Sequence, residues 1–209
     1  MQRSPQQDPH TARMETVAAS MIEALEAWRP SLPLETEAQL RLALANVLEV
    51  EADRIGRASS VDIRVLCEGP SKRSGAVQIV PMHILRGSFW PDITVVEKDG
   101  TNPVMAVEAK LLQHGAGPVA TSVGQALFYR YGKPCVGRGK TRIAEGHAYP
   151  RVVVFIVDQR GETVGSEDTP DQDAAIKSVL TNLGVNVITR RPNQALHPTP
   201  AGAIVSRRG

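Results

Sequence analysis

Two carboxylates and a lysine, Asp92, Glu108 and Lys110, are the residues whose types and spacing best suit chemistry in this sequence. They lie in residues 91–110, where β-branched residues flank a turn sequence with Asp-Gly and Asn-Pro, which predicts a β-hairpin. A hairpin centred on Gly100 places Asp92 opposite Glu108. Because side chains alternate with period two, the carboxylates and Lys110 share one face and the other face is apolar. The same register pairs Thr94 with Ala106, Val96 with Val104, Ile93 with Val107 and Val95 with Met105.

Asp92 and Glu108 are like charges on adjacent strands, an arrangement that destabilises a sheet unless something offsets it. A divalent metal ion is a natural offset. Mg²⁺ prefers carboxylate and water oxygens and is usually held by one or two carboxylates, with water and substrate phosphate completing its shell. Lys110, on the same face, is placed to hold a metal-bound water or to stabilise charge on a phosphate. The three residues therefore indicate a site for a divalent metal ion and a phosphate group.

The hairpin residues resemble the motif of the PD-(D/E)XK phosphodiesterase superfamily, the restriction-endonuclease-like nucleases. The resemblance implies that Asp92, Glu108 and the backbone carbonyl of Ala109 hold Mg²⁺ or Mn²⁺. It also implies that Lys110 positions the attacking water. The residues that carry the resemblance are Pro91, Asp92, Glu108, Ala109 and Lys110.

Gln125 and Tyr129 resemble the QxxxY helix that follows this motif in several branches of the superfamily. They are four residues apart and share one helix face, where they either orient the water, contact the phosphate backbone or serve helix packing. The family often has a further glutamate on the helix before the sheet, for a second metal. Glu37 is the best match, Glu49 and Glu51 are the alternatives, and a solvated acid at a helix start is an equally good interpretation of Glu37.

Hydrophobic spacing predicts two helices, a run of strands, and then helix, strand, helix and strand. This order predicts an α/β fold with a mixed central sheet flanked by helices. With the resemblance, it implies a restriction-endonuclease-like core, αβββαβ, over about residues 35–158. The expected helices are 12–28, 35–53, 121–131 and 171–183; the expected strands are 61–67, 76–85, the two hairpin strands, 151–158, which is apolar enough to be buried on both faces, and 185–189.

The length of 209 residues suits one domain, which we place at residues 12–190. Residues 1–11 are polar and contain proline, and we expect them to be disordered. Residues 191–209 fit no packed element and are expected to form a flexible tail.

A formal net charge of +2 means that affinity for a polyanion depends on local basic patches. The two cysteines, Cys67 and Cys135, have neither metal-ligand spacing nor a disulfide framework, and reduced thiols fit a cytoplasmic protein. No apolar run is long enough to cross a bilayer, and the N-terminal residues lack the apolar segment of a signal peptide. We therefore expect no membrane partner.

A glycine-rich basic segment follows the QxxxY helix. Its Gly-Lys-Thr at 139–141 is not a nucleotide-binding loop, because the glycine expected five positions earlier is Pro134. A loop that grips a nucleic-acid backbone and a merely soluble loop are equally good interpretations. The basic residues in question are Lys133, Arg138, Lys140 and Arg142.

The expected function is that of a metal-dependent nuclease. DNA is the favoured substrate because most of the resembled family acts on it, while the residues leave RNA open. A homodimer would allow double-strand cleavage by symmetry. A non-catalytic nucleic-acid-binding module on the same fold is the alternative. A small-molecule hydrolase using His83 or His147 lacks a nucleophile elbow and zinc-spaced histidines.

Overall fold

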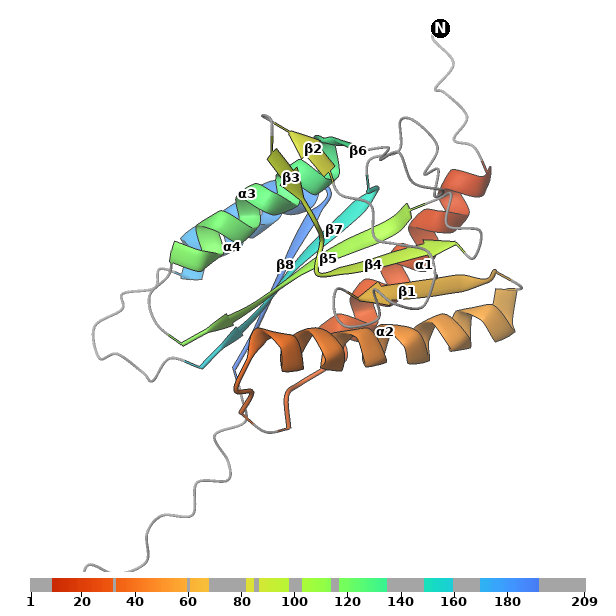
Figure 1. Cartoon of the computed structure of the whole chain (residues 1–209). Coiled ribbons are helices and arrows are strands. Elements are labelled where there is room, and N and C mark those ends of the chain that lie inside the picture. Colours follow the sequence, from red (N-terminus) through yellow and green to blue (C-terminus); the bar gives the residue numbers. More distant parts are fainter. Residues whose placement is uncertain are drawn as a thin grey trace, which may run out of the picture.

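The structure is a computed structural model of the chain. It contains a five-stranded sheet in the order β1-β4-β5-β7-β8 and a small sheet in the order β3-β2-β6. In Figure 1, α1 and α2 lie on one face of the large sheet, and α3 and α4 lie on the other. The prediction of a mixed sheet flanked by helices is therefore confirmed. The structure describes residues 9–31, 33–59, 61–67, 82–84, 87–97, 103–113, 117–134, 149–159 and 170–191.

The large sheet is mixed because its two halves are joined differently. β1, β4 and β5 are antiparallel neighbours, whereas β5, β7 and β8 run parallel. The parallel pairs are linked through the helices α3 and α4, as such crossovers require. The strands are β1 (Ile63–Cys67), β2 (Met82–Ile84), β3 (Gly87–Phe89), β4 (Ile93–Glu97), β5 (Pro103–Leu112), β6 (Lys133–Pro134), β7 (Arg151–Asp158) and β8 (Val185–Arg190).

The helices differ from the predictions mainly at their ends. The helix α3 begins four residues earlier than predicted, with Pro118 in its first turn, where a proline is tolerated. The helix α2 runs beyond its predicted end at residue 53. No helix in the described ranges is long and apolar enough to span a bilayer. The helices are α1 (Pro9–Ala27), α2 (Glu37–Ser59), α3 (Gly117–Tyr131) and α4 (Pro170–Asn182).

The hairpin register agrees with the prediction over three pairs and differs at the fourth. Ile93 pairs with Val107, and the next two residues of β4 pair as expected. Val96, however, pairs with Pro103 instead of Val104, because a β-bulge shifts the register after Val95. The pairs nearest to Asp92 and Glu108, beginning with Ile93 and Val107, keep the predicted register.

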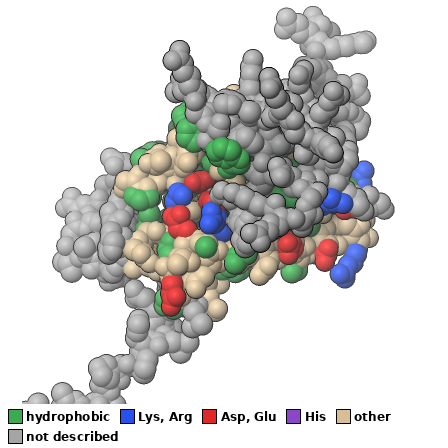
Figure 2. Space-filling view, viewed as in Figure 1, with side chains coloured by type: hydrophobic (Ala, Val, Ile, Leu, Met, Phe, Trp, Pro, Cys, Tyr) green, Lys and Arg blue, Asp and Glu red, His purple; other side chains and the backbone are tan. Residues whose placement is uncertain are grey.

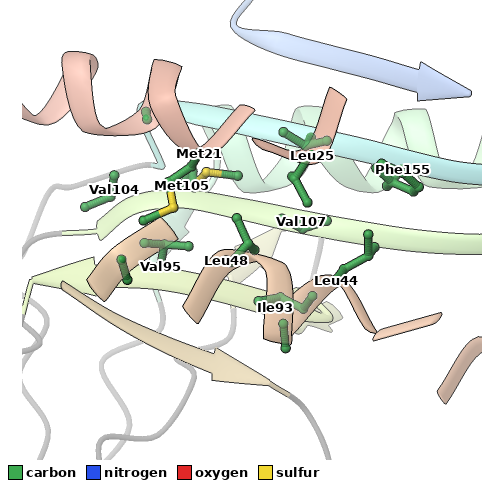
Figure 3. Packing of buried hydrophobic residues seen from close by; sticks show 14 of the residues in the cluster. Met21, Leu25, Leu44, Leu48, Ile93, Val95, Val104, Met105, Val107 and Phe155 are labelled. Carbon is green, nitrogen blue, oxygen red and sulfur yellow. The ribbon is translucent and has the colours of Figure 1, made fainter. Parts of the chain in front are cut away.

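The odd-numbered hairpin residues form the apolar face, as predicted. Figure 3 shows Ile93, Val95 and Val107 packed against residues of α1 and α2, including Leu44 and Leu48. Burying such side chains is the main favourable contribution to folding, at roughly 1.5–3 kcal/mol for each. This core therefore fixes the distance between α2 and the hairpin.

The opposite face of the sheet packs against α3 and α4. Here Ala106 lies with Val154 of β7 and with Ala126 and Tyr129 of α3. β7 is buried on both faces, as its apolar run predicted. Ala106 and Glu108 project toward this layer, whereas the even-numbered Val104 packs with the core of α1 and α2.

The small sheet was only partly foreseen. The single strand predicted at 76–85 corresponds, in the described residues, to β2, and β3 is a separate strand. β6 has two residues and includes a proline, so no periodicity announces it. Phe89 of β3 lies 5.3 Å, centroid to centroid, from Phe128 and joins the small sheet to α3.

Candidate active site

Asp92 and Glu108 come together where β4 begins and β5 nears its end. Both are buried, with 7% and 3% of their surface exposed. Asp92 lies just before β4, and its Oδ2 accepts a hydrogen bond of 2.8 Å from the backbone N–H of Ala109. The main chain of β5 thereby holds Asp92 beside Glu108, as the hairpin register predicted.

Each oxygen of the Glu108 carboxylate has a polar partner. Its Oε1 lies 3.1 Å from Nζ of Lys110, and its Oε2 accepts a hydrogen bond of 3.0 Å from the hydroxyl of Tyr129. Burial, and then the charge of Asp92, raise the pKa of Glu108, while Lys110 and Tyr129 lower it by less. The folded chain thus makes a negative charge at Glu108 unfavourable, a penalty that a bound cation would reduce.

Lys110 lies between two glutamates. Its Nζ is 3.1 Å from Glu108 and 3.5 Å from Oε2 of Glu37. Burial lowers the pKa of Lys110, but Glu108, Glu37 and Asp92 together raise it above its ordinary value. Lys110 is therefore an ammonium at neutral pH and acts as a hydrogen-bond donor and a positive charge.

Glu37 is the first residue of α2, and the capping of that helix positions it. Thr36 Oγ1 accepts a hydrogen bond from the N–H of Gln39, whose side-chain oxygen accepts one from the N–H of Glu35. These contacts satisfy N–H groups that a helix start leaves without partners. Glu37 then reaches β5, where its Oε1 lies 3.4 Å from the N–H of Leu111.

Of the three glutamates considered from the sequence, only Glu37 contacts these hairpin residues in the described part of the chain. Glu51 hydrogen-bonds Arg54 and Ser20 near the other end of α2. Glu49 is exposed, twelve residues along the helix from Glu37, a separation of roughly 18 Å.

Tyr129 is buried against Glu108. Its hydroxyl is 3.0 Å from Glu108 Oε2 and 2.9 Å from the carbonyl oxygen of Trp90. Burial, with the charge of Glu108, raises the pKa of Tyr129, so it remains a neutral donor. Gln125, one turn earlier, is half-buried, and among the described residues it makes no hydrogen bond to the carboxylates.

Arg41 is a site residue that sequence reasoning missed. Its Nη1 lies 3.0 Å from Oδ1 of Asp92, in an ion pair across 51 positions of sequence. Arg41 follows Glu37 by four residues on α2, so the two share one helix face. That spacing was the only available signal. We call Asp92, Glu108, Lys110, Glu37, Tyr129 and Arg41 together the hairpin site.

The hairpin site reaches solvent through its charged rim. The side chains of Lys110, Arg41 and Glu37 are 18%, 25% and 44% exposed, whereas those of the two hairpin carboxylates are nearly covered. Figure 2 shows acidic and basic side chains next to one another on one face of the molecule. A ligand that approaches Asp92 and Glu108 from solvent would therefore pass Lys110, Arg41 and Glu37.

The donor set suits a hard divalent cation. Two carboxylates and a main-chain carbonyl, that of Ala109, are oxygen ligands of the kind that Mg²⁺ and Mn²⁺ take. Within the described ranges, no group of three or more histidine, cysteine, aspartate or glutamate residues is arranged to hold a metal. Because Mg²⁺ is commonly held by one or two carboxylates with water and phosphate, the pair Asp92 and Glu108 fits it.

The basic segment after α3 is largely outside the described residues. The main chain of Lys133 belongs to β6 and pairs with that of His83 in β2, and the side chain of neither is described. The other predicted nucleic-acid contacts lie outside the described residues, as does His147. These predicted contacts are Arg138, Lys140 and Arg142.

Comparisons of the chain with protein-family models, with curated proteins and with solved structures find no match. Functional assignment therefore depends on the geometry of the hairpin site. Chemically, that geometry combines two buried carboxylates with an ammonium and a guanidinium. Such a combination suits reactions in which one oxygen replaces another on an anionic group such as a phosphate.

Proposed function

We propose that the chain is a metal-dependent nuclease with a restriction-endonuclease-like core, of the PD-(D/E)XK type. The observation that carries the proposal is the pair of buried carboxylates, Asp92 and Glu108, joined to Lys110 two residues along β5. The element order α2, β1, β4, β5, α3 and β7, with the four strands adjacent in that order, supports the αβββαβ core.

Asp92, Glu108 and the carbonyl of Ala109 are the proposed ligands of the cation, Mg²⁺ or Mn²⁺. When bound, this ion supplies Lewis-acid charge at the phosphate and lowers the pKa of water. Glu37 is the proposed further carboxylate. Its contact with Lys110 ties the helix α2 to the same site.

The protein's own side chains position the reacting groups and neutralise negative charge. Lys110 is a charged donor that orients the attacking water and stabilises negative charge on the phosphate. Tyr129 donates to Glu108 and fixes the direction of its carboxylate, as outer partners of metal ligands do. Hydrolysis joins the water's hydroxyl to phosphorus, breaks the bond from phosphorus to the leaving oxygen and transfers the remaining proton to that oxygen.

DNA is the proposed substrate, because the resembled superfamily acts mostly on DNA. The segment with Lys133, Arg138, Lys140 and Arg142 is the proposed contact to the nucleic-acid backbone. RNA is the alternative substrate, and a homodimer would place two sites for double-strand cleavage. We infer neither a nucleotide cofactor nor a membrane partner.

The test is cleavage by the purified protein of supercoiled plasmid, linear duplex, single-stranded DNA and RNA. Each substrate is incubated with Mg²⁺, Mn²⁺ or EDTA, beside Asp92→Ala and Lys110→Ala. Lys177→Ala on the exposed face of α4 is the matched control. We expect metal-dependent cleavage that both site variants lose and the control keeps.

Two results separate the alternatives. Full activity of Lys110→Ala contradicts the assignment of the site. Absence of both cleavage and divalent-cation binding in the wild type favours a non-catalytic nucleic-acid-binding module.

A further inference from the structure

Arg41 bonds the same carboxylate that we assign to the cation. Its Nη1 lies 3.0 Å from Oδ1 of Asp92, while the other oxygen, Oδ2, accepts the N–H of Ala109. The N–H of Ala109 belongs to a sheet and cannot leave. The guanidinium is on a long side chain that is 25% exposed, so it is the partner of Asp92 that can move.

A guanidinium and a divalent cation at one carboxylate oxygen repel each other. Like charges a few ångströms apart in a partly buried site interact strongly, because solvent screens them less than it screens surface charges. Lys110 already pairs with Glu108, the other carboxylate of the pair. With Asp92, Glu108 and Glu37 against Lys110 and Arg41, the formal charge of the hairpin site is −1 in the structure. A divalent cation would make it +1, so an anion is needed for balance.

A phosphate diester is the anion that restores this balance. Arginine suits it, because the planar fork of the guanidinium matches two phosphate oxygens and stays charged at every working pH. Arg41 is also carried by a helix that is fixed to the hairpin through Glu37 and through the core, so its reach is defined.

We propose that Arg41 is an exchangeable phosphate ligand. It neutralises Asp92 before a cation binds, and it then turns from Oδ1 to a nonbridging oxygen of the substrate phosphate. This inference rests on the proposed function and adds to it a residue that binds the substrate and couples its arrival to that of the cation. The rival reading, in which Arg41 permanently orients Asp92, predicts the opposite effect on cation affinity.

The experiment is a calorimetric titration of Mn²⁺ into the full-length wild type and Arg41→Met without substrate. Removal of a competing positive charge should tighten Mn²⁺ binding by about tenfold. If Arg41 instead supports Asp92, Arg41→Met binds Mn²⁺ more weakly, as loss of an outer partner does, and the inference is overturned. Arg54→Met is the matched control, because Arg54 lies on the same helix, is 63% exposed and pairs with Glu51.

A second titration, of inorganic phosphate at saturating Mg²⁺, tests the other half of the exchange. Arg41→Met should bind phosphate more weakly than the wild type, and equal binding overturns the assignment of Arg41 as a phosphate ligand. Arg41→Lys keeps the charge without the fork, so it should retain the cation affinity of the wild type and weaken phosphate binding. It also serves if Arg41→Met does not fold, which circular dichroism checks.

Failure of the proposed function has its own signature. If neither the wild type nor Arg41→Met binds Mn²⁺, the metal site itself is refuted, and the inference with it. If the wild type binds Mn²⁺ and Arg41→Met binds it more weakly, only the inference fails.

Discussion

Tyr129→Phe removes a single oxygen atom from the centre of the hairpin site. The hydroxyl of Tyr129 has one proton and two acceptors, Glu108 Oε2 at 3.0 Å and the Trp90 carbonyl at 2.9 Å. One proton serves one acceptor at a time, so the two bonds do not add in full. A buried hydrogen bond to a charged group is worth about 1.5–3 kcal/mol and a neutral one about 1 kcal/mol. We therefore expect the variant to lose about 2 kcal/mol of unfolding free energy.

The larger consequence concerns Glu108. The hydrogen bond from Tyr129 lowers the pKa of Glu108, against the opposing effects of burial and of Asp92. Without that bond the pKa of Glu108 rises further, so a proton competes more strongly with the cation. The acidic limb of the activity profile should move to higher pH, and Mn²⁺ affinity at fixed pH should fall by about 10–100-fold.

The other two tyrosines of the chain are matched controls. Tyr149 is also buried, and its hydroxyl lies 3.2 Å from Thr94 Oγ1 instead of a carboxylate. Burial raises the pKa of Tyr149 to about 12, so Tyr149→Phe removes a neutral hydroxyl. Tyr131 is exposed and donates to the carbonyl of Leu183. Tyr149→Phe should lose about 1 kcal/mol without a shift of the pH profile, and Tyr131→Phe should change neither quantity.

The assays are urea unfolding in EDTA, Mn²⁺ titration, and kcat/KM for the cleaved substrate between pH 5 and 9. The reasoning is refuted if Tyr129→Phe loses stability as Tyr149→Phe does but keeps the Mn²⁺ affinity and the acidic limb of the wild type. Tyr129 would then be a packing residue of α3, the alternative that the sequence left open.

Three further predictions concern the stability of the fold and the role of Glu37. In EDTA at pH 8, Glu108→Gln should be more stable than the wild type by about 0.5–2 kcal/mol. Burial and the neighbouring aspartate raise the pKa of Glu108 in the folded state, so the stability that is present below the unfolded-state pKa of 4.5 is lost as the pH rises through the folded-state pKa. Urea titrations at several pH values check this. A difference in unfolding free energy between Glu108→Gln and the wild type that does not depend on pH would contradict it. Gly184→Ala should lower the unfolding free energy by about 1–3 kcal/mol, because Gly184 has a φ of 79° and an added Cβ would lie 2.6 Å from Nε of Arg130; an unchanged urea midpoint would refute this. Glu37→Gln should lower kcat/KM by about 10–100-fold through loss of the contact with Lys110, whereas Glu49→Gln on the same helix should leave it unchanged, and equal values for both variants would exclude Glu37 from the site.

Local signals in the sequence were sufficient for a mixed sheet flanked by helices and for three of the four hairpin pairs. β7 was recognisable because a strand buried on both faces is apolar throughout, and its buried residues agree. The register near Asp92 followed from turn residues and alternation. The register shift between Val95 and Val96, which skips Val104 of β5, did not follow, because the residues around it are all apolar and alternation does not mark it.

Elements without a periodic signal were not predicted, or were predicted with other bounds. β3 and β6 are two or three residues long, and such strands exist only because β2 lies between them as a partner. The start of α3 at Gly117 was missed because glycine and proline in sequence favour a loop, although proline is accepted in a first helical turn.

By itself, the sequence determined which residues alternate on the hairpin and therefore that Asp92, Glu108 and Lys110 share a face. That conclusion needs only the period of a strand and the chemistry of one turn, which are properties of about twenty consecutive residues. Only the tertiary structure decided that Glu37, and not Glu49 or Glu51, contacts Lys110, and that Arg41 pairs with Asp92. Those contacts join residues more than fifty positions apart, and they depend on how the apolar stripe of α2 packs against the sheet, which no local pattern specifies.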